Sequence, residues 1–366
     1  MTGRSSEWDR AKNLLAVRLD TVGDVLMTTP AIRALTAPGG RRVTLLTSRA
    51  GAAIAQLIPD LSGVVEWEAP WMKASGGSDP AGDQAMVERL RAASFDAAVI
   101  FTAYSQPSLP AALICSLADI PLRLAHSRDK PYGLLTDWVP ETEPEQGVRH
   151  EVRRQLDLVA TGGAPTADAR LSLAVPAAAR AAVGARLDAL GIGPDGRWLV
   201  LHPGATAPSR RYPAEGFAAA ARRFAEEDGA RVVVTGDADE RELAASIASA
   251  VPRAVSLAGE LSLAELCGLI AQAPLVVSNN TGPAHIAAAV GTPVVTVYAL
   301  TNPQHAPWRV AHRLLFHDVS CRWCHSSVCL SGHHDCVRRV APSALVSSGR
   351  VIAEGWGSTR SRKSLS

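Results

Sequence analysis

The sequence predicts an α/β protein built from two doubly wound domains. Short apolar runs alternate with helical patterns through both halves of the chain, which is typical of parallel sheets covered by helices on both faces. The 366 residues, 47% of them hydrophobic, suffice for two cores. In such domains ligands bind beyond the carboxyl ends of the strands, so residues that carry chemistry are expected just after strands.

The first half contains apolar runs that predict strands at 14–17, 43–46, 64–67 and 97–101. Helical patterns are found at 25–36, 85–94, 108–118 and 149–160. The second half repeats this order, with strands predicted near 198–202, 231–235, 254–257, 274–278 and 294–298. The helices between them are predicted near 213–227, 239–249, 263–271 and 283–290.

A stretch rich in Gly, Pro and Ala, TGGAPTADARLSLAVPAAAR, separates the halves and predicts a boundary near residue 170. We expect an N-terminal domain at 1–170, a C-terminal domain at 171–341, and a C-terminal helix with a disordered tail at 342–366. The two domains are expected to face each other across a cleft.

Composition and charge exclude several classes of protein. Lysine occurs at only four positions, so 37 basic residues minus 4 leaves 33 arginines, yet the formal net charge is only +2. No basic run interleaves with aromatic residues, which argues against a nucleic-acid partner. The polar start and the lack of any apolar stretch of roughly 18 residues predict a cytoplasmic protein. The basic tail GSTRSRKSLS predicts at most peripheral membrane contact.

The segment VRLDTVGDVLMTTPAIRAL carries the first candidate catalytic residue, Asp24, between a strand and a helix. A carboxylate at this strand end could accept a proton from an attacking hydroxyl. Asp24 could equally cap the helix. Pro30 must either kink the helix or mark its true start. No GxGxxG follows a predicted strand and no GxxxxGK[ST] is present, which argues against a dehydrogenase or a P-loop NTPase.

Three further segments could bind a nucleotide diphosphate. After the strand at 198–202, Thr206, Ser209 and Arg210 could contact phosphate oxygens, and the guanidinium could stabilise charge on a leaving group. Glu240 begins a helix where a carboxylate could bind a ribose diol or complement the helix dipole. In SNNTGPAHIAAAVGTP, a helix begins after a buried strand, and its free N–H groups could bind a phosphate. Each segment also has a purely structural interpretation.

A cysteine cluster near the C-terminus, CRWCHSSVCLSGHHDC, could hold a structural zinc ion or an iron–sulfur cluster. Its spacing matches no standard zinc pattern, so reduced or disulfide-paired thiols are an equal alternative. The candidate ligands are Cys321, Cys324, Cys329 and Cys336.

Taken together, these motifs resemble the bacterial heptosyltransferases of glycosyltransferase family 9, which build the lipopolysaccharide inner core. The resemblance runs from about residue 13 to 340 and rests on VGDVLMTTPAIRAL, HPG followed by RRYP, TGDADE, the segment around SNNTGPAHIAAAVGTP, and the cysteine cluster. It implies a GT-B fold, a nucleotide-activated heptose donor, usually ADP-heptose, a hydroxyl acceptor, and inverting transfer that needs no catalytic metal.

The resemblance also implies roles for individual residues. Asp24 matches the catalytic base, and Arg210 stands where members usually have a lysine near the diphosphate. In the donor site, the residues that match phosphate, ribose, adenine and sugar contacts are Thr206, Glu240, Leu261, Asn280, Thr281, Gly282 and His285.

Two departures affect substrate choice. Asn280 occupies a position that is commonly acidic and that meets donor sugar hydroxyls, and FTAYSQPS replaces an acidic loop on the acceptor side. The acceptor is therefore either a lipopolysaccharide core or a small natural product. Two other classes stay open: a nucleotide-sugar epimerase, which donor turnover without acceptor would favour, and a non-catalytic nucleotide-sugar binding protein, which binding without turnover would favour.

Overall fold

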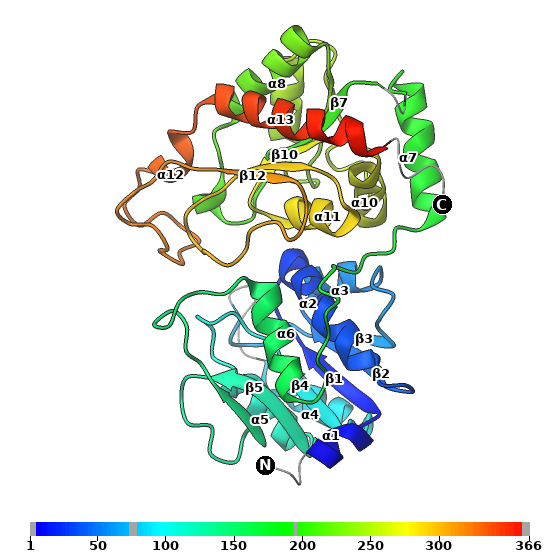
Figure 1. The fold of residues 1–366 in the computed structure, drawn as a ribbon, viewed down its shortest axis with the longest axis vertical. Coiled ribbons are helices and arrows are strands. Elements are labelled where there is room, and N and C mark those ends of the chain that lie inside the picture. The colour runs from blue at the N-terminus through cyan, green and yellow to red at the C-terminus, as the bar shows by residue number, and fades with distance from the viewer. Residues whose placement is uncertain (1–4, 73–78, 194–195, 361–366) are drawn as a thin grey trace. The chain divides into compact units, whose positions relative to one another are not determined.

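The computed structural model describes residues 5–72, 79–193 and 196–360. The chain separates into two compact units, an N-terminal unit at Met1–Ala174 and a C-terminal unit at Val175–Ser366. Each unit contains a six-stranded sheet in which all recorded strand pairs are parallel, with helices packed against it (Figure 1). The predicted α/β class is thereby confirmed for both halves.

The N-terminal unit has the strand order β3-β2-β1-β4-β5-β6. Its strands are β1 (Asn13–Val17), β2 (Arg42–Thr47), β3 (Gly63–Glu66), β4 (Ala97–Ile100), β5 (Leu122–Ser127) and β6 (Asp137–Pro140). Its helices are α1 (Ser5–Arg10), α2 (Val22–Thr36), α3 (Arg49–Ala55), α4 (Pro80–Ala92), α5 (Leu109–Leu117) and α6 (Glu151–Thr161). Strand order reverses between β1 and β4, and the crevice beyond such a switch point is where ligands bind.

The helices of this unit form two groups. Helix α2 packs with α3 and α6, whereas α4 packs with α5. Four consecutive residues of β1 are fully buried, because a central strand of a doubly wound sheet is covered on both faces. One core of the unit joins β1, β2 and β4 to apolar side chains of α4 and α5, among them Met86, Leu90 and Cys115.

The C-terminal unit repeats the same topology with the order β12-β11-β10-β7-β8-β9. Its strands are β7 (Trp198–His202), β8 (Arg231–Val234), β9 (Val255–Ser256), β10 (Val276–Asn279), β11 (Val294–Val297) and β12 (His312–Leu315). Its helical segments are α7 (Ala177–Ala189), η1 (Pro208–Arg210), α8 (Ala214–Asp228), α9 (Arg241–Ser249), α10 (Leu263–Gln272), α11 (Gly282–Val290), α12 (Asp335–Arg338) and α13 (Pro342–Arg360). The switch point here lies between β7 and β10.

Two helix groups cover this second sheet as well. Helix α10 packs with α7 and α11, whereas α8 packs with α9 and with α13, the red helix beside it in Figure 1. The large core on the α8 side joins Phe217 and Phe224 of α8 to Leu345 and Val346 of α13. The C-terminal helix expected from the sequence is therefore an integral part of this unit's core.

Several elements were not predicted, and each has a weak local pattern. β5 contains Arg123 and His126, β6 alternates between half-buried and exposed residues, and β12 begins His-Arg, so none reads as a buried apolar run. Helix α7 begins inside the Ala-rich stretch that suggested a linker. Helix α13 ends at Arg360, four residues into the segment expected to be a disordered tail, and 361–366 lie outside the described residues.

Helix α2 begins at Val22, so Pro30 lies inside it and does not mark its start. Proline has no N–H to offer the carbonyl one turn earlier, which is that of Leu26. The Thr29 hydroxyl donates to this carbonyl instead, at 2.7 Å. A side-chain hydrogen bond thus replaces the missing backbone bond, and the helix continues to Thr36.

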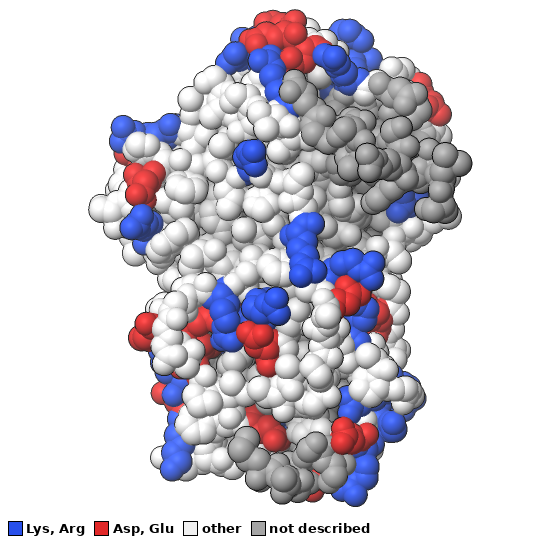
Figure 2. Space-filling view, in the orientation of Figure 1, with Lys and Arg blue, Asp and Glu red and all other residues white. Residues whose placement is uncertain are grey.

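On the face drawn in Figure 2, blue and red side chains are interspersed within each unit and most of the surface is uncharged. Over the described part of the chain, no helix combines the length and apolar character needed to cross a membrane.

Candidate active site

Asp24 lies in the first turn of α2, directly after β1, at the switch point of the N-terminal unit. Its Oδ2 accepts hydrogen bonds from the Thr21 N–H at 3.3 Å and the Thr21 hydroxyl at 3.1 Å, and its Oδ1 accepts one from Arg18 Nη2 at 3.1 Å. The carboxylate does close the helix start, as the capping interpretation predicted. Its side chain is 18% exposed.

Arg18 organises this edge of the sheet, and sequence reasoning missed it. The guanidinium is fully buried and forms ion pairs with Asp20 at 3.0 Å, Asp24 at 3.1 Å and Glu151 at 2.9 Å. Burial alone would lower the pKa of Arg18, but the three carboxylates raise it above its usual value. Arg18 is therefore a permanent positive charge that favours the ionised form of Asp24, the form a base needs. The only hint in the sequence is an arginine at the end of an apolar strand.

Asp20 is a second carboxylate that forms an ion pair with the Arg18 guanidinium. Burial, reinforced by the charge of Asp24, raises the pKa of Asp20 to about 6, although Arg18 and a hydrogen bond from Gln106 oppose the shift. Two neighbouring carboxylates thus share one guanidinium and are almost equally exposed, 14% for Asp20 and 18% for Asp24. They differ in their other partners, because Gln106 donates to Asp20 and Thr21 donates to Asp24.

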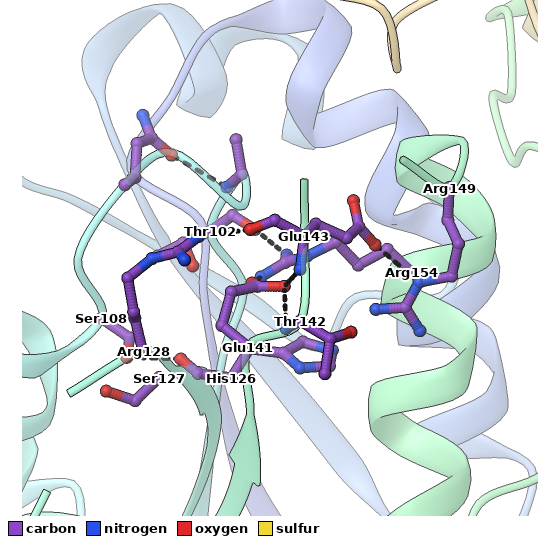
Figure 3. Close-up of polar contacts among 12 residues, drawn as sticks. Thr102, Ser108, His126, Ser127, Arg128, Glu141, Thr142, Glu143, Arg149 and Arg154 are labelled. Carbon is purple, nitrogen blue, oxygen red and sulfur yellow. Dashed lines mark hydrogen bonds and ion pairs between the residues drawn. The ribbon is translucent and has the colours of Figure 1, made fainter. Parts of the chain in front are cut away.

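A second polar cluster lies beyond the ends of β4, β5 and β6 (Figure 3). Arg154 of α6 is buried and donates to the carbonyl of Thr102 and to the carboxylate of Glu141. His126, at the end of β5, is 4% exposed, and burial followed by the charge of Arg154 lowers its pKa to about 4. His126 is therefore neutral at pH 7. The cluster fixes the loops that form the expected acceptor side of this unit.

Glu240 lies at the start of α9 and rests on two glycines of the C-terminal unit. A Cβ at Gly204 would fall 1.9 Å from Glu240 Oε1, and one at Gly236 would fall 2.9 Å from Glu240 Cβ. Burial raises the pKa of Glu240, opposed by the hydrogen bond from the Asp237 N–H at 3.1 Å. The two glycines after β7 and β8 therefore make room for this carboxylate beside the switch point.

His202, the last residue of β7, approaches Glu240 with 3.8 Å between Nε2 and Oε2. Burial lowers the pKa of His202 to about 4, so the imidazole is neutral at pH 7 and the contact is not an ion pair. Its Nδ1 lies 3.1 Å from the Thr235 hydroxyl. His202 therefore brings no positive charge to Glu240.

The loop after β7 holds the other predicted phosphate contacts. Thr206 is exposed, Ser209 is buried, and Arg210 is half-buried in the short helix η1. The Ser209 hydroxyl donates to the Ser326 carbonyl at 2.7 Å, so its proton is committed to fixing the loop. Arg210 forms no ion pair with any described carboxylate, and its Nη2 donates to Asn302 Oδ1 at 3.2 Å. Arg210 is therefore a positive charge without an acidic partner in the described residues.

Helix α11 begins directly after β10, at the switch point, with Thr281 as the residue before its first turn. Thr281 and Gly282 are half-buried. The start of a helix offers N–H groups to an anion, so the phosphate cradle expected here stays a prediction. Asn280 is 4% exposed, and its Oδ1 accepts a hydrogen bond from the Ala299 N–H at 3.1 Å. His285 is buried inside the helix, and Leu261 is half-buried just before α10. The neighbouring Asn279 ties this edge to the loop after β7 by donating to the Pro203 carbonyl at 2.7 Å.

The expected metal site at the cysteine cluster is not supported by the geometry. In the part of the chain that is described, no three His, Cys, Asp or Glu side chains are arranged to hold a metal ion. All four cysteines are free: Cys321 and Cys324 are exposed, whereas Cys329 and Cys336 are half-buried. Cys321 contacts His333 instead, with 3.6 Å between Sγ and Nε2. Structural zinc requires four ligands around one ion, so the described arrangement of these side chains does not support such a site.

Both units thus place polar side chains at the switch point of a parallel, doubly wound sheet, which is the architecture of GT-B glycosyltransferases. The family model for glycosyltransferase family 9 (heptosyltransferase) matches residues 84–334. Since this is more than half of the chain, the protein belongs to glycosyltransferase family 9, as the sequence resemblance predicted.

Individual relatives agree with this assignment. The chain is 28% identical over 161 residues to lipooligosaccharide heptosyltransferase 2 of Campylobacter jejuni, which covers 42% of this chain and 50% of that protein. It is 36% identical over 111 residues to lipooligosaccharide heptosyltransferase 2 of Haemophilus influenzae. This match covers 29% of this chain and 32% of that protein. The chain thus matches about a third to a half of the length of these two relatives.

A solved structure shows the same fold over nearly the whole chain. The structure of Escherichia coli ADP-heptose lps heptosyltransferase II superimposes with a TM-score of 0.73 at 20% identity, covering 94% of this chain and 99% of that chain. The predicted fold of two Rossmann-like units is therefore confirmed.

Proposed function

We propose that the protein is an inverting glycosyltransferase that moves a heptose from ADP-heptose to a hydroxyl group of a glycolipid core. One observation carries the proposal: both switch points hold the polar residues that this transfer needs, Asp24 in one unit and Arg210, Glu240 and the start of α11 in the other. Membership of family 9 and the names of the relatives support the donor and the acceptor.

In the proposed reaction, Asp24 accepts the proton of the acceptor hydroxyl. The acceptor oxygen then forms a bond to the anomeric carbon while the bond from that carbon to the diphosphate breaks, and the electron pair leaves with the diphosphate. Arg210 and the N–H groups at the start of α11 stabilise the growing negative charge. Because these groups are fixed cations and dipoles, the reaction needs no metal ion.

The proposed contacts hold four parts of the donor: the ribose, the base, the diphosphate and the sugar. Glu240 accepts hydrogen bonds from the ribose hydroxyls, Leu261 packs beside the base, and Thr206 contacts the diphosphate. Asn280 meets the sugar hydroxyls. Its Oδ1 is already occupied by the Ala299 N–H, so its Nδ2 is the group that faces the sugar in this proposal. A nucleotide-sugar donor also supports a cytoplasmic reaction.

The test combines binding and turnover. The protein is mixed with a panel of nucleotide sugars, and thermal denaturation identifies the one that stabilises it; ligand at about 100 times its Kd adds roughly 2.7 kcal/mol. The stabilising donor is then offered with a truncated lipopolysaccharide core and, separately, with a small hydroxyl-bearing molecule. Transfer of heptose to the core supports the proposal. Stabilisation by a different nucleotide sugar, or conversion of the donor without acceptor, contradicts it.

A further inference from the structure

The side chain of Arg210 is the first member of a short chain of hydrogen bonds that continues through Asn302 to His325. Its Nη2 donates to Asn302 Oδ1 at 3.2 Å, and Asn302 Nδ2 lies 3.3 Å from His325 Nδ1. An amide whose oxygen accepts from a guanidinium has only its NH₂ group left for the imidazole. The amide therefore donates, and His325 Nδ1 accepts, which fixes the orientation of the Asn302 side chain.

Asn302 is itself rigidly placed. It belongs to the loop that follows β11, and the hydroxyl of the buried Tyr298 donates to its carbonyl at 2.6 Å. The cysteine-rich loop at 321–336 runs along the same segment: the Trp323 N–H donates to Leu300 at 2.7 Å and the His325 N–H donates to Thr301 at 2.9 Å. Backbone bonds thus bring the imidazole to the amide.

The cysteine-rich loop also holds the other side of η1. The Ser209 N–H donates to the Ser327 carbonyl at 3.0 Å, and the Ser209 hydroxyl donates to the Ser326 carbonyl at 2.7 Å. Residues 323–327 therefore contact the backbone beside Arg210 and, through His325 and Asn302, its guanidinium. A long arginine side chain that would otherwise sample many rotamers is restrained at both ends.

We propose that Asn302 is a positioning residue that directs Arg210 toward the leaving diphosphate, with His325 fixing the orientation of Asn302. The inference rests on the proposed function, because it assigns Arg210 to the diphosphate. It also gives the cysteine-rich loop a role that requires no metal: the loop is the support for this chain of hydrogen bonds.

The test is a double-mutant cycle on donor turnover, using Arg210→Ala, Asn302→Ala and the double variant. Asn302→Ala keeps the Arg210 charge but removes the amide that orients it. Misplacing such a group costs roughly tenfold to a hundredfold in rate, so kcat/KM is expected to fall by about that factor. In the Arg210→Ala background the same change should have almost no further effect, because residues that act through one another are not additive. His325→Ala should give a smaller loss that vanishes in the Asn302→Ala background.

A binding measurement separates positioning from a general structural effect. Only ADP has the second phosphate, so Asn302→Ala should lower the ratio of ADP to AMP affinity roughly tenfold, as Arg210→Ala does. Gln272→Ala is the matched control, because Gln272 is a half-buried amide of the same unit that hydrogen-bonds helix carbonyls at Gly268 and Arg180. The control should leave the ratio unchanged.

Two results would overturn the inference by different routes. If Asn302→Ala keeps wild-type kcat/KM, or if its loss is equally large in the Arg210→Ala background, Asn302 does not act through Arg210. If Arg210→Ala itself retains full activity and full ADP affinity, the assignment of Arg210 in the proposed function fails as well.

Discussion

Asp24 accepts hydrogen bonds at the start of α2 and is also the base in the proposed mechanism. One of its oxygens accepts from Thr21 and the other from Arg18, and the side chain stays partly exposed. The competing interpretations of the sequence, cap and base, therefore do not exclude each other.

Asp24→Asn should abolish most transfer and leave donor affinity nearly intact, because the amide keeps the shape and one oxygen but cannot accept the proton. General base catalysis is typically worth on the order of a hundredfold or more. Turnover and donor Kd are measured on the same preparation. A variant that retains more than about one tenth of the wild-type turnover would place the base elsewhere.

Asp20→Asn should change how stability depends on pH. The pKa of Asp20 is raised to about 6 in the folded protein. A carboxyl group whose pKa is higher in the folded protein contributes stability that is fully present below its pKa in the unfolded chain, near 4. This contribution is lost as the pH rises through the folded pKa of about 6. A shift of about two pKa units is worth roughly 3 kcal/mol, so the asparagine variant should gain about that much relative to wild type between pH 4 and pH 8.

Chemical denaturation at several pH values measures this gain. Asp129→Asn, a change at an exposed position of the same unit, is the control and should show a flat difference. A flat difference for Asp20→Asn too would mean that Arg18 cancels the cost of burying the carboxylate.

Asn280→Asp should shift the preference between donor sugars by roughly tenfold in the ratio of kcat/KM values. Aspartate can keep the hydrogen bond from the Ala299 N–H through one oxygen, so the fold of the turn is retained. The second oxygen replaces a donor with an acceptor, and a mispaired buried polar group costs about 1 to 3 kcal/mol. An unchanged ratio across the donor panel would show that Asn280 only shapes the turn.

The elements that place these residues differ in how far the sequence predicted them. The central strands and the helices after them were predicted because their apolar patterns are strong and local. The edge strands β6 and β12 were missed because their residues are only partly buried and carry little pattern. The same division holds for the site: Asp24 and Glu240 follow strands directly, whereas Arg18 and Asn302 owe their importance to partners as far as 133 and 92 residues away in the sequence.

The turn after β7 offers a test at the level of an element. Gly204→Ala would place a methyl group 1.9 Å from Glu240 Oε1, so the flexible carboxylate must move while the strand stays in place. We expect the melting temperature to change little and donor affinity to fall about tenfold or more. Gly193→Ala is the control, because a Cβ there meets no atom within 4 Å. Wild-type donor affinity for Gly204→Ala would show that the position of Glu240 is unimportant.

The whole molecule combines two units of identical strand order whose sites carry opposite chemistry. The N-terminal unit offers carboxylates around a buried arginine, which suits proton removal. The C-terminal unit offers a cation without an acidic partner in the described residues, together with a helix start, which suits a diphosphate. In the proposed mechanism, these groups supply the charge stabilisation that a divalent cation would otherwise provide.

Excess EDTA should therefore leave both the transfer rate and the melting temperature unchanged. An arginine and the N–H groups at the start of a helix supply the charge stabilisation that a divalent cation supplies in other transferases. The rate is followed with the best donor of the panel, and unfolding is followed in parallel. A loss of rate that only magnesium reverses would contradict the proposed mechanism. A lower melting temperature in EDTA would instead indicate that the protein holds a structural metal.

Helix α6 contacts both polar clusters of the N-terminal unit through side chains of its first turn. Its first residue, Glu151, binds Arg18 beneath Asp24, and Arg154, one turn further, binds Glu141 among the loops after β4 to β6. Because both ion pairs are made by the same turn of one helix, a displacement of α6 at one ion pair also moves the other. Directed evolution of the loops for a new acceptor would therefore also disturb the base at Asp24, and compensating mutations should accumulate in the first turn of α6.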